Sequence, residues 1–316
     1  MDLDKKIDVI VVGELNVDLI LNEINSLPEL GKEILASAMT LTLGSSSAIF
    51  ASNLSSLGST VSFAGKIGKD LFGNLVLECL HEKGVETDLI LESQDLHTGA
   101  TVVLNYKENR AMVTHAGAME HLQIHEIPME KLSQAKHLHL SSYFLQKGLI
   151  KNMASLFRQA KQFGLTTSLD PQWDPAEKWE MNLEEILPLV DVFLPNEEEL
   201  LNLTGQSSVD TALDSLSSCA NSVVVKLGNR GSLSSHQGKR VLIPAFLNAS
   251  VVDAIGAGDS FNAGFIHQFI QQAEMETCQR FANLVAAIST TASGGTSAFR
   301  DIHHKLQNAG PLYGFL

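Results

Sequence analysis

Basic residues are scarce in this sequence. Its 316 residues include 22 Lys and Arg against 36 Asp and Glu, which gives a formal net charge of −14. Nucleic-acid backbones and anionic membrane surfaces are bound by clustered Lys and Arg side chains. The charge balance therefore argues against nucleic-acid and membrane-surface roles, and we expect the excess of acid mainly to favour solubility.

Cysteines and long apolar runs are also few. Cys79, Cys219 and Cys278 lie far apart and form no CxxC pair, so neither a disulfide framework nor a structural zinc site is predicted. No apolar stretch approaches the roughly 18 residues of a membrane span, and the short N-terminal run leads straight into Gly13. We expect no signal peptide, no membrane span and a cytoplasmic protein with reduced thiols.

The remaining composition is that of a folded enzyme, with 44% hydrophobic and 18% charged residues. Short β-rich runs alternate with longer amphipathic segments, a pattern typical of a mostly parallel sheet with helices on both faces. Continuous apolar runs such as VIVVG and DVFLP indicate buried parallel strands. Strands are predicted at residues 8–13, 60–65, 137–141, 165–170, 191–194 and 222–227. Helices are predicted at residues 47–57, 71–83, 149–163, 197–203, 209–219, 258–272 and 276–292.

Two regions, residues 19–43 and 89–116, interrupt this alternation. Residues 98–105 and 110–115 look like an antiparallel pair around a turn at 107–109. No repeat, low-complexity tract or linker marks a domain boundary. We therefore expect one α/β domain over residues 1–316, with a small β-sheet lid formed by the two regions. The exposed face of such a sheet is commonly covered by a second subunit, so a homodimer through the lid is expected.

The segment DAIGAGDSFNAGF at residues 253–265 concentrates the chemistry. Small residues lead directly into an apolar-periodic helix, where backbone N–H groups and the helix dipole can hold an anion. Asp259 could accept a proton from an attacking hydroxyl while Gly256, Ala257 and Gly258 surround a phosphoryl group. The alternative is an ordinary helix start with an acid in its first turn. No GxxxxGKS/T loop and no protein-kinase HRD or DFG set occurs, so phosphate binding is expected at this helix.

This segment resembles the C-terminal signature of the ribokinase-like carbohydrate kinases, the PfkB family. Other segments resemble that family's motifs in the same order, over about residues 7 to 300. They are GELNVD at 13–18, GSSSAIFASNLSSLG at 44–58, GKIGKDLFG at 65–73, NEEE at 196–199, KLGNRG at 226–231 and FAN at 281–283 followed by SGG at 293–295.

The resemblance implies a Rossmann-type α/β core with a β-sheet lid and in-line transfer of the ATP γ-phosphoryl group, with Asp259 as base. It places Asn196, Glu199, Lys226, Gly228, Gly231 and Asn283 at the nucleotide, and Asn16, Asp18 and Gly44 at the sugar. Glu199, with Asn196, would act on Mg²⁺ through water. Asp253 and the carbonyl of Ile255 correspond to a K⁺ site, although a purely structural Asp253 is the alternative.

The acceptor pocket departs from the family pattern. The family's GG-x-x-x-N motif has a glycine and an asparagine where this chain has Ser45 and Ile49, so one substrate hydroxyl loses its amide partner or is absent. Arg110 could reach a substrate or be a solvated turn residue. Trp173, in a loop after a predicted strand, could cover an apolar sugar face or anchor the loop. Ribose is not the expected acceptor, because Ser141-Ser142-Tyr143 stand where ribokinase has a glutamate.

We therefore predict an ATP-dependent kinase that phosphorylates a hydroxyl of a small sugar. A nucleoside kinase with the same fold is the alternative, favoured by Ile49. A non-catalytic sugar- or nucleotide-binding regulator is the alternative of another class, and the intact Gly256–Asp259 segment argues against it. The eleven histidines have no zinc-site spacing and are assigned to no metal.

Overall fold

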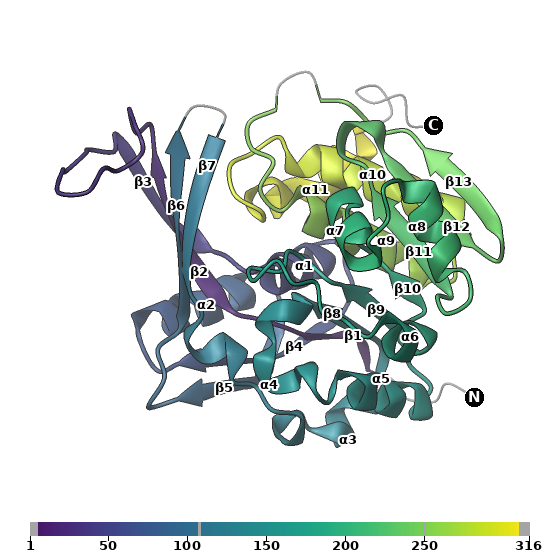
Figure 1. The fold of residues 1–316 in the computed structure, drawn as a ribbon. Helices are drawn as coiled ribbons and strands as arrows, with labels where there is room; N and C mark the ends of the chain where they lie inside the picture. Colours follow the sequence, from purple (N-terminus) through teal and green to yellow (C-terminus); the bar gives the residue numbers. More distant parts are fainter. Residues whose placement is uncertain (1–5, 107–108, 249–250, 310–316) are drawn as a thin grey trace.

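Two β-sheets organise the computed structural model, which describes residues 6–106, 109–248 and 251–309. A nine-stranded sheet has the order β13-β12-β11-β10-β9-β8-β1-β4-β5, and a four-stranded sheet has the order β3-β2-β6-β7. Figure 1 shows the smaller sheet rising beside the body formed by the larger sheet and its helices.

The large sheet is parallel from β5 to β11 and ends in an antiparallel hairpin. Its strands are β1 (Ile7–Val12), β4 (Val61–Gly68), β5 (Glu86–Ser93), β8 (Ala135–Ser141), β9 (Thr166–Asp170), β10 (Val192–Phe193), β11 (Ser222–Lys226), β12 (Ser232–His236) and β13 (Lys239–Ile243). The six strands predicted from apolar runs are all present, which confirms the predicted parallel core.

Every predicted helical segment contains helix, with one interruption, and the short helices α3, α6 and α11 lie outside the predicted segments. They are α1 (Ser46–Ser56), α2 (Leu71–Glu82), α3 (Met129–Leu132), α4 (Lys147–Ile150), α5 (Met153–Gln162), α6 (Leu183–Ile186), α7 (Glu197–Thr204), α8 (Val209–Leu216), α9 (Ala257–Phe269), α10 (Met275–Ser289) and α11 (Ile302–Gln307). The single helix predicted over residues 149–163 is wrong, because α4 ends before α5 begins. Asn152, with φ −115° and ψ 6°, leaves the helical region between them.

Side-chain alternation along β1 separates two cores, one on each face of the large sheet. Val9 and Val11 belong to the core covered by α1, α2, α9, α10 and α11. Ile10 and Val12 belong to the core covered by α3, α5, α6, α7 and α8. Because both faces are buried, the strand is apolar at every position from Val9 to Val12, which is why this stretch reads as a continuous apolar run.

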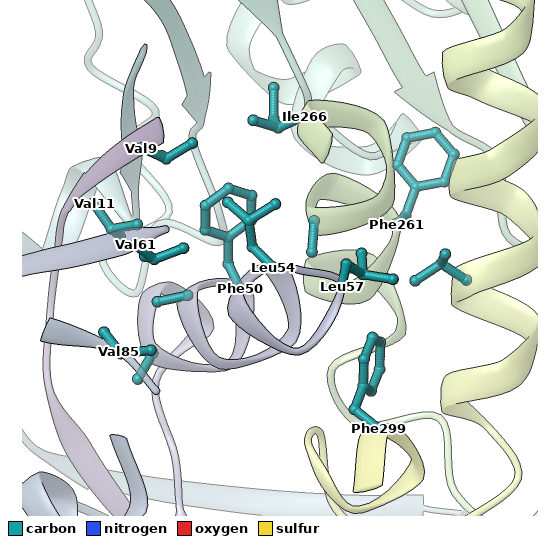
Figure 2. Packing of buried hydrophobic residues seen from close by; sticks show 14 of the residues in the cluster. Val9, Val11, Phe50, Leu54, Leu57, Val61, Val85, Phe261, Ile266 and Phe299 are labelled. Atoms are coloured by element: carbon teal, nitrogen blue, oxygen red, sulfur yellow. The ribbon is translucent and has the colours of Figure 1, made fainter. Parts of the chain in front are cut away.

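Helix α1 links the sheet to the helices that carry the site. Figure 2 shows Phe50 and Leu54 of α1 between strand residue Val9 and helix α9, from which Phe261 and Ile266 project. Phe50 and Leu54 have no exposed surface. The packing of α1 against α9 brings the beginnings of the two helices to the same end of the sheet.

The four-stranded sheet consists of β2 (Asn16–Asn22), β3 (Ala38–Leu43), β6 (Gly99–Tyr106) and β7 (Asn109–His115). Its outer pairs are antiparallel, and the pairing of β6 with β7 is the one predicted. The central pair, β2 with β6, is parallel. The residues 89–93 assigned to the lid belong to β5 in the large sheet, and residues 16–18 join the small one. Residues 107 and 108 of the predicted turn lie outside the described residues.

A chain of buried polar groups crosses β8 and β9. His137 contacts the hydroxyls of Thr166 and Ser168 at 2.8 and 2.6 Å, and His139 contacts those of Ser168 and Ser141 at 2.7 and 2.8 Å. Burial lowers the pKa of His137 to about 3 and that of His139 well below its usual value. A neutral imidazole has one donor and one acceptor nitrogen, so each histidine donates one of its two hydrogen bonds and accepts the other.

Replacement of Ser168 by Ala is expected to lower the free energy of unfolding by about 2–4 kcal/mol, because it leaves one nitrogen of each buried imidazole without a partner. Urea unfolding followed by circular dichroism measures the loss. Ser56→Ala is the control, since the Ser56 hydroxyl bonds only the Ser52 carbonyl of its own helix. Equal losses in the two variants would show that the histidine chain contributes no special stability.

Candidate active site

A cavity of about 1000 Å³ opens where the carboxyl ends of the large sheet's strands face the small sheet. Its lining residues come from both sheets and from α1, α7, α9 and α10. Sixteen of the residues singled out from the sequence line it: Asp18, Ser45, Ile49, Arg110, Trp173, Asn196, Glu199, Lys226, Gly228, Gly231, Ile255, Gly256, Ala257, Gly258, Asp259 and Asn283. Asn16, Gly44 and Asp253 do not reach the cavity wall.

The start of α9 forms the floor of the cavity. Gly256 is its N-cap with φ 72°, and a Cβ there would lie 2.8 Å from the Cα of Gly295, so only glycine fits. The first N–H groups of a helix have no intrahelical acceptor, and they carry the positive end of the helix dipole. Gly256, Ala257 and Gly258 therefore bring helix N-terminal N–H groups to the cavity wall, and Asp259 lies in the same turn, 7% exposed.

Asp259 belongs to a cluster of buried acids around one lysine. Lys226 Nζ lies 2.8 Å from Oδ2 of Asp170, which is completely buried. Burial and the charge of Asp170 raise the pKa of Asp259 well above its ordinary value, against the opposing effect of Lys226. Burial alone would lower the pKa of Lys226, but Asp170 and Glu199 raise it, so the ammonium group stays charged.

Asn196 and Glu199 form a reciprocal cap at the start of α7. The Asn196 backbone N–H and side-chain amide donate to the two Glu199 oxygens at 2.8 and 2.7 Å, and the Glu199 N–H donates to Asn196 Oδ1 at 2.8 Å. Burial and the charge of Asp170 raise the pKa of Glu199 to about 7. Each Glu199 oxygen can accept a further hydrogen bond, and Glu199 lines the cavity, so it suits a water molecule of hydrated Mg²⁺.

Asp18 of β2 brings a carboxyl group of the small sheet to the cavity wall. Asn16 Nδ2 donates to Asp18 Oδ1 at 2.9 Å from behind, so Asn16 positions Asp18 and does not line the cavity. Gly44 is required beside them, because a Cβ would lie 2.3 Å from Asp18 Oδ1. Burial, with the charge of Glu14, raises the pKa of Asp18 to about 6, and the guanidinium of Arg110 opposes this shift.

The three serines at the start of α1 have different roles. Ser45, at φ 70°, donates to the Glu14 carbonyl at 2.6 Å and accepts from the Ala48 N–H at 2.9 Å, so it caps the helix. Ser47 donates to the Glu14 carboxylate. Ser46 instead hydrogen-bonds Asp259. The hydroxyls of Ser45 and Ser47 are therefore used within the protein.

Ile49, which replaces the family's asparagine, packs against the two glycine segments beside α9. A Cβ on Gly295 would lie 2.6 Å from Ile49 Cδ1, and one on Gly256 would lie 3.1 Å from its Cγ2. Ile49 is 4% exposed and still lines the cavity. The cavity therefore has an apolar wall beside the first turn of α9.

The antiparallel hairpin of β11 and β12 forms another part of the cavity wall. Gly231, at φ 99°, has no room for a side chain, because a Cβ would lie 2.0 Å from the Ile243 carbonyl oxygen. Gly228 begins the short turn between the strands, at φ 58°. Asn283 Nδ2 donates to the carbonyls of Ile243 and Pro244 at 3.1 and 3.2 Å, so this amide fixes the wall where β13 ends.

Asp253 lies in the loop that leads into α9. Its two oxygens accept hydrogen bonds from the N–H groups of Ile255 and Gly294, each at 2.9 Å. The carboxylate thus joins the loop before α9 to the loop after α10. Within the described residues, no group of three or more His, Cys, Asp or Glu side chains is placed to hold a metal ion.

Sequence reasoning missed several groups of the site that are buried or half-buried. Asp170 and Gln172 lie in the DPQW segment, whose tryptophan was considered but whose acid and amide were not. Gln172 Nε2 lies 2.9 Å from Asp170 Oδ2 and 3.0 Å from Asp259 Oδ1. Asn262 also donates to Asp170, and Glu14 lies under α1. A polar residue at the carboxyl end of a predicted parallel strand was the available signal for Asp170.

Trp173 lines the cavity with 43% of its surface exposed. Its ring meets Trp179 edge to face at 5.0 Å, and Trp179 meets Phe144 in the same way at 5.6 Å. These aromatic contacts hold Trp173 in place, so the tryptophan both anchors its loop and presents a flat surface to the cavity.

Comparison with known proteins places this site in a family. The family model described as pfkB family carbohydrate kinase matches residues 6–302, so the chain belongs to that family. An uncharacterised sugar kinase of Archaeoglobus fulgidus is 30% identical over 234 residues, which are 74% of this chain and 92% of that protein. The deoxyribokinase of Salmonella typhi is 29% identical over 304 residues, 93% of this chain and 96% of that enzyme.

The fold of the chain is also similar to that of solved kinases. A structure of Arabidopsis thaliana ribokinase complexed with ribose and ATP superposes with a TM-score of 0.84 at 26% identity, covering 98% of this chain and 99% of that one. The predicted ribokinase-like fold is thereby confirmed, and the chain is an ATP-dependent carbohydrate kinase. None of the described helices has the length and apolar character needed to cross a bilayer.

Replacement of Asp259 by Asn is expected to stabilise the fold at pH 8 by about 0.5–2 kcal/mol, a range typical when a residue kept for function is replaced. The pKa of Asp259 is higher in the folded protein than in the unfolded chain. The contribution of Asp259 to the free energy of unfolding is therefore present below its pKa in the unfolded chain and is lost as the pH rises through its pKa in the folded protein. The neutral amide avoids that loss, so the advantage of the variant should disappear toward pH 4.

Urea unfolding at pH 8 and at pH 4 measures this difference. Asp174→Asn is the matched control, because the Asp174 carboxylate is also buried but accepts three backbone N–H bonds. That variant should be less stable than the parent. A destabilised Asp259→Asn protein at pH 8 would contradict the electrostatic account of the site.

Proposed function

We propose that this site transfers the γ-phosphoryl group of ATP to a hydroxyl of a small sugar, with Asp259 as general base. The observation that carries the proposal is the buried Asp259 carboxylate in the first turn of α9, beside Gly256, Ala257 and Gly258 in the cavity wall. Its raised pKa suits a group that has to accept a proton near neutral pH.

The groups in the cavity have separate parts in the reaction. The acceptor hydroxyl gives its proton to Asp259 as its oxygen bonds to the γ-phosphorus, and the bond from that phosphorus to the bridging oxygen of ADP breaks. The N–H groups at the start of α9 stabilise the charge on the transferring phosphoryl oxygens. Lys226 is paired with Asp170, so it holds the acid cluster together close to that turn.

The cofactors of the proposed reaction have fitting residues. Magnesium would neutralise charge on the ATP phosphates, and Glu199 with Asn196 would hold its water ligands at the nucleotide side. The acid cluster supports this role, because its three carboxyl groups, those of Asp170, Glu199 and Asp259, outnumber the single cationic group of Lys226. Potassium is proposed beside Asp253 and the carbonyl of Ile255, on the far side of the anion-binding turn. The free cysteines and the need for ATP favour the cytoplasm as the location.

The acceptor side of the cavity favours a molecule with both hydroxyls and a flat apolar face. Asp18 and Arg110 supply polar contacts, whereas Ile49 and Trp173 supply apolar ones. A small sugar uses the first pair and lays its apolar ring face on the second. A nucleoside uses the same polar pair for its ribose and stacks its base on Trp173, which makes a nucleoside kinase the second candidate.

A test of this function measures ADP release from ATP–Mg²⁺ with a panel of ketoses, aldoses, sugar acids, inositols and nucleosides. Asp259→Asn is expected to bind ATP normally and to lower turnover by about 10²–10⁴, the range for a lost general base. An acceptor that gives an Asp259-dependent signal identifies the substrate class, sugar or nucleoside. Turnover by Asp259→Asn near that of the parent would refute the assignment of the base.

The outer face of the small sheet supports a homodimer through this sheet. Register places Leu41, Leu19, Val102 and Val113 in one row across its four strands, on the face opposite the cavity-lining Asp18, Val103 and Arg110. Leu41 and Val113 are 43% and 70% exposed, and Met39 in the next row is 67% exposed. A contiguous apolar row of this kind is suited to bury itself against the same row of a second copy.

Introduction of a charge into this row is expected to convert the dimer into a folded monomer. Val113→Glu places a carboxylate at an exposed position of the face, where a second copy would bury it without a partner. Sedimentation velocity at micromolar concentration reads out the mass. Thr40→Glu is the control, because register puts exposed Thr40 on the other face of the sheet. A parent protein that sediments as a monomer would exclude this interface.

A further inference from the structure

The amide of Gln172 bridges the two acids at the centre of the site. Its Nε2 donates to Asp170 Oδ2 at 2.9 Å and to Asp259 Oδ1 at 3.0 Å. An ionised carboxylate only accepts hydrogen bonds, so the amide nitrogen, with its two hydrogens, is the end that has to face both acids. No other side chain in the described residues is recorded with hydrogen bonds to both Asp170 and Asp259.

Gln172 reaches this position through a loop with an unusual backbone. It has φ 58°, in the left-handed region that residues other than glycine seldom adopt. The buried Asp174 carboxylate fixes the loop beyond it, because it accepts the N–H groups of Ala176, Lys178 and Trp179 at 2.9, 2.8 and 2.7 Å. The loop therefore holds the glutamine in a conformation that it would rarely adopt in a free peptide.

The charges around Asp259 show why a neutral donor matters here. Asp170 of β9 and Glu14 of the β1–β2 loop oppose its ionisation, while Lys226 of β11 and the Ser46 hydroxyl of α1 favour it. Glu199 of α7 shares the same lysine. Among the described residues, the Lys226 ammonium forms its ion pair with Asp170, and none is recorded to Asp259. Gln172 thus donates a hydrogen bond to Asp259, whereas the ammonium group of Lys226 forms its ion pair with Asp170.

We propose that Gln172 is a positioning residue of the phosphoryl transfer, which holds Oδ1 of Asp259 through one amide hydrogen and leaves Oδ2 for the acceptor hydroxyl. The inference rests on the proposed role of Asp259 as base. A hydrogen bond to the ionised form favours that form, so the amide also favours the deprotonated base against the charge of Asp170. The second amide hydrogen fixes the orientation through Asp170, which Lys226 anchors in turn.

The proposal is tested on the full-length enzyme with Gln172→Met and Gln172→Gly. Methionine keeps the length of the side chain without its donors. Glycine removes the side chain and fits φ 58° without strain, so its fold should be at least as stable as the parent. The measurement is kcat/KM for the acceptor from pH 5.5 to 9 at saturating ATP–Mg²⁺, with melting temperature as a check on folding.

Both variants are expected to move the acid limb of the profile to higher pH by about one unit and to lower kcat/KM roughly tenfold at pH 6.5, with a smaller loss at pH 9. Lys178→Ala, in the same loop with an exposed side chain, should leave the profile unchanged. A purely structural role would lower activity by the same factor at every pH and would not move the limb.

Two outcomes overturn the proposal in distinguishable ways. Unchanged profiles, or losses that do not depend on pH, in folded Gln172→Met and Gln172→Gly refute the role of Gln172 while the assignment of Asp259 stands. An acid limb of the kcat/KM profile that reported the ionisation of Glu199, and not that of Asp259, would likewise stay at the same pH in both variants. Normal turnover by Asp259→Asn, measured beside them, would refute the base assignment and this inference together.

Discussion

The buried ion pair between Lys226 and Asp170 is the interaction on which the site depends. One ammonium group, that of Lys226, acts on the carboxyl groups of Asp170, Glu199 and Asp259. The charge of Asp170 in turn raises the pKa of Asp259 and that of Glu199. Without the lysine, the burial of three carboxylates would be prohibitive, because an unpaired buried charge costs several kcal/mol. The parallel strands β9 and β11 hold the two partners at their carboxyl ends, so the fold and the electrostatics are inseparable.

The parts of the structure that sequence reasoning predicted are those specified locally. The apolar run of β1 indicates a strand buried on both faces, and Gly256 and Asp259 lie together in one short segment. The parts that it missed depend on contacts between distant segments. Asp170 and Gln172 matter only because β9 ends beside α9, and Glu14 only because it lies under α1. Asn16, Gly44 and Asp253 show the same limit, since family resemblance names them but only packing shows that they support the wall from behind.

The acceptor pocket shows how one substitution is accommodated by its surroundings. Ser45 occupies a position at φ 70° that favours glycine, and its hydroxyl offsets part of the strain by capping α1 and bonding the Glu14 carbonyl. Ile49, one turn further, fills the space between two glycine segments. The family's polar corner has thus become a helix cap next to an apolar wall, while the anion-binding turn beneath it is retained.

The parallel pairing of β2 with β6 also has a consequence for the order in which the protein is assembled. β2 follows β1 almost directly, but its central partner is reached only after β3, α1, β4, α2 and β5 have been placed. A pairing closed by so long a loop forms late, since the entropy of closure is lost before the contact can stabilise the chain. During synthesis, Asp18 therefore leaves the ribosome long before the sheet that orients it exists, and the acceptor half of the active site matures after much of the sheet that supports it.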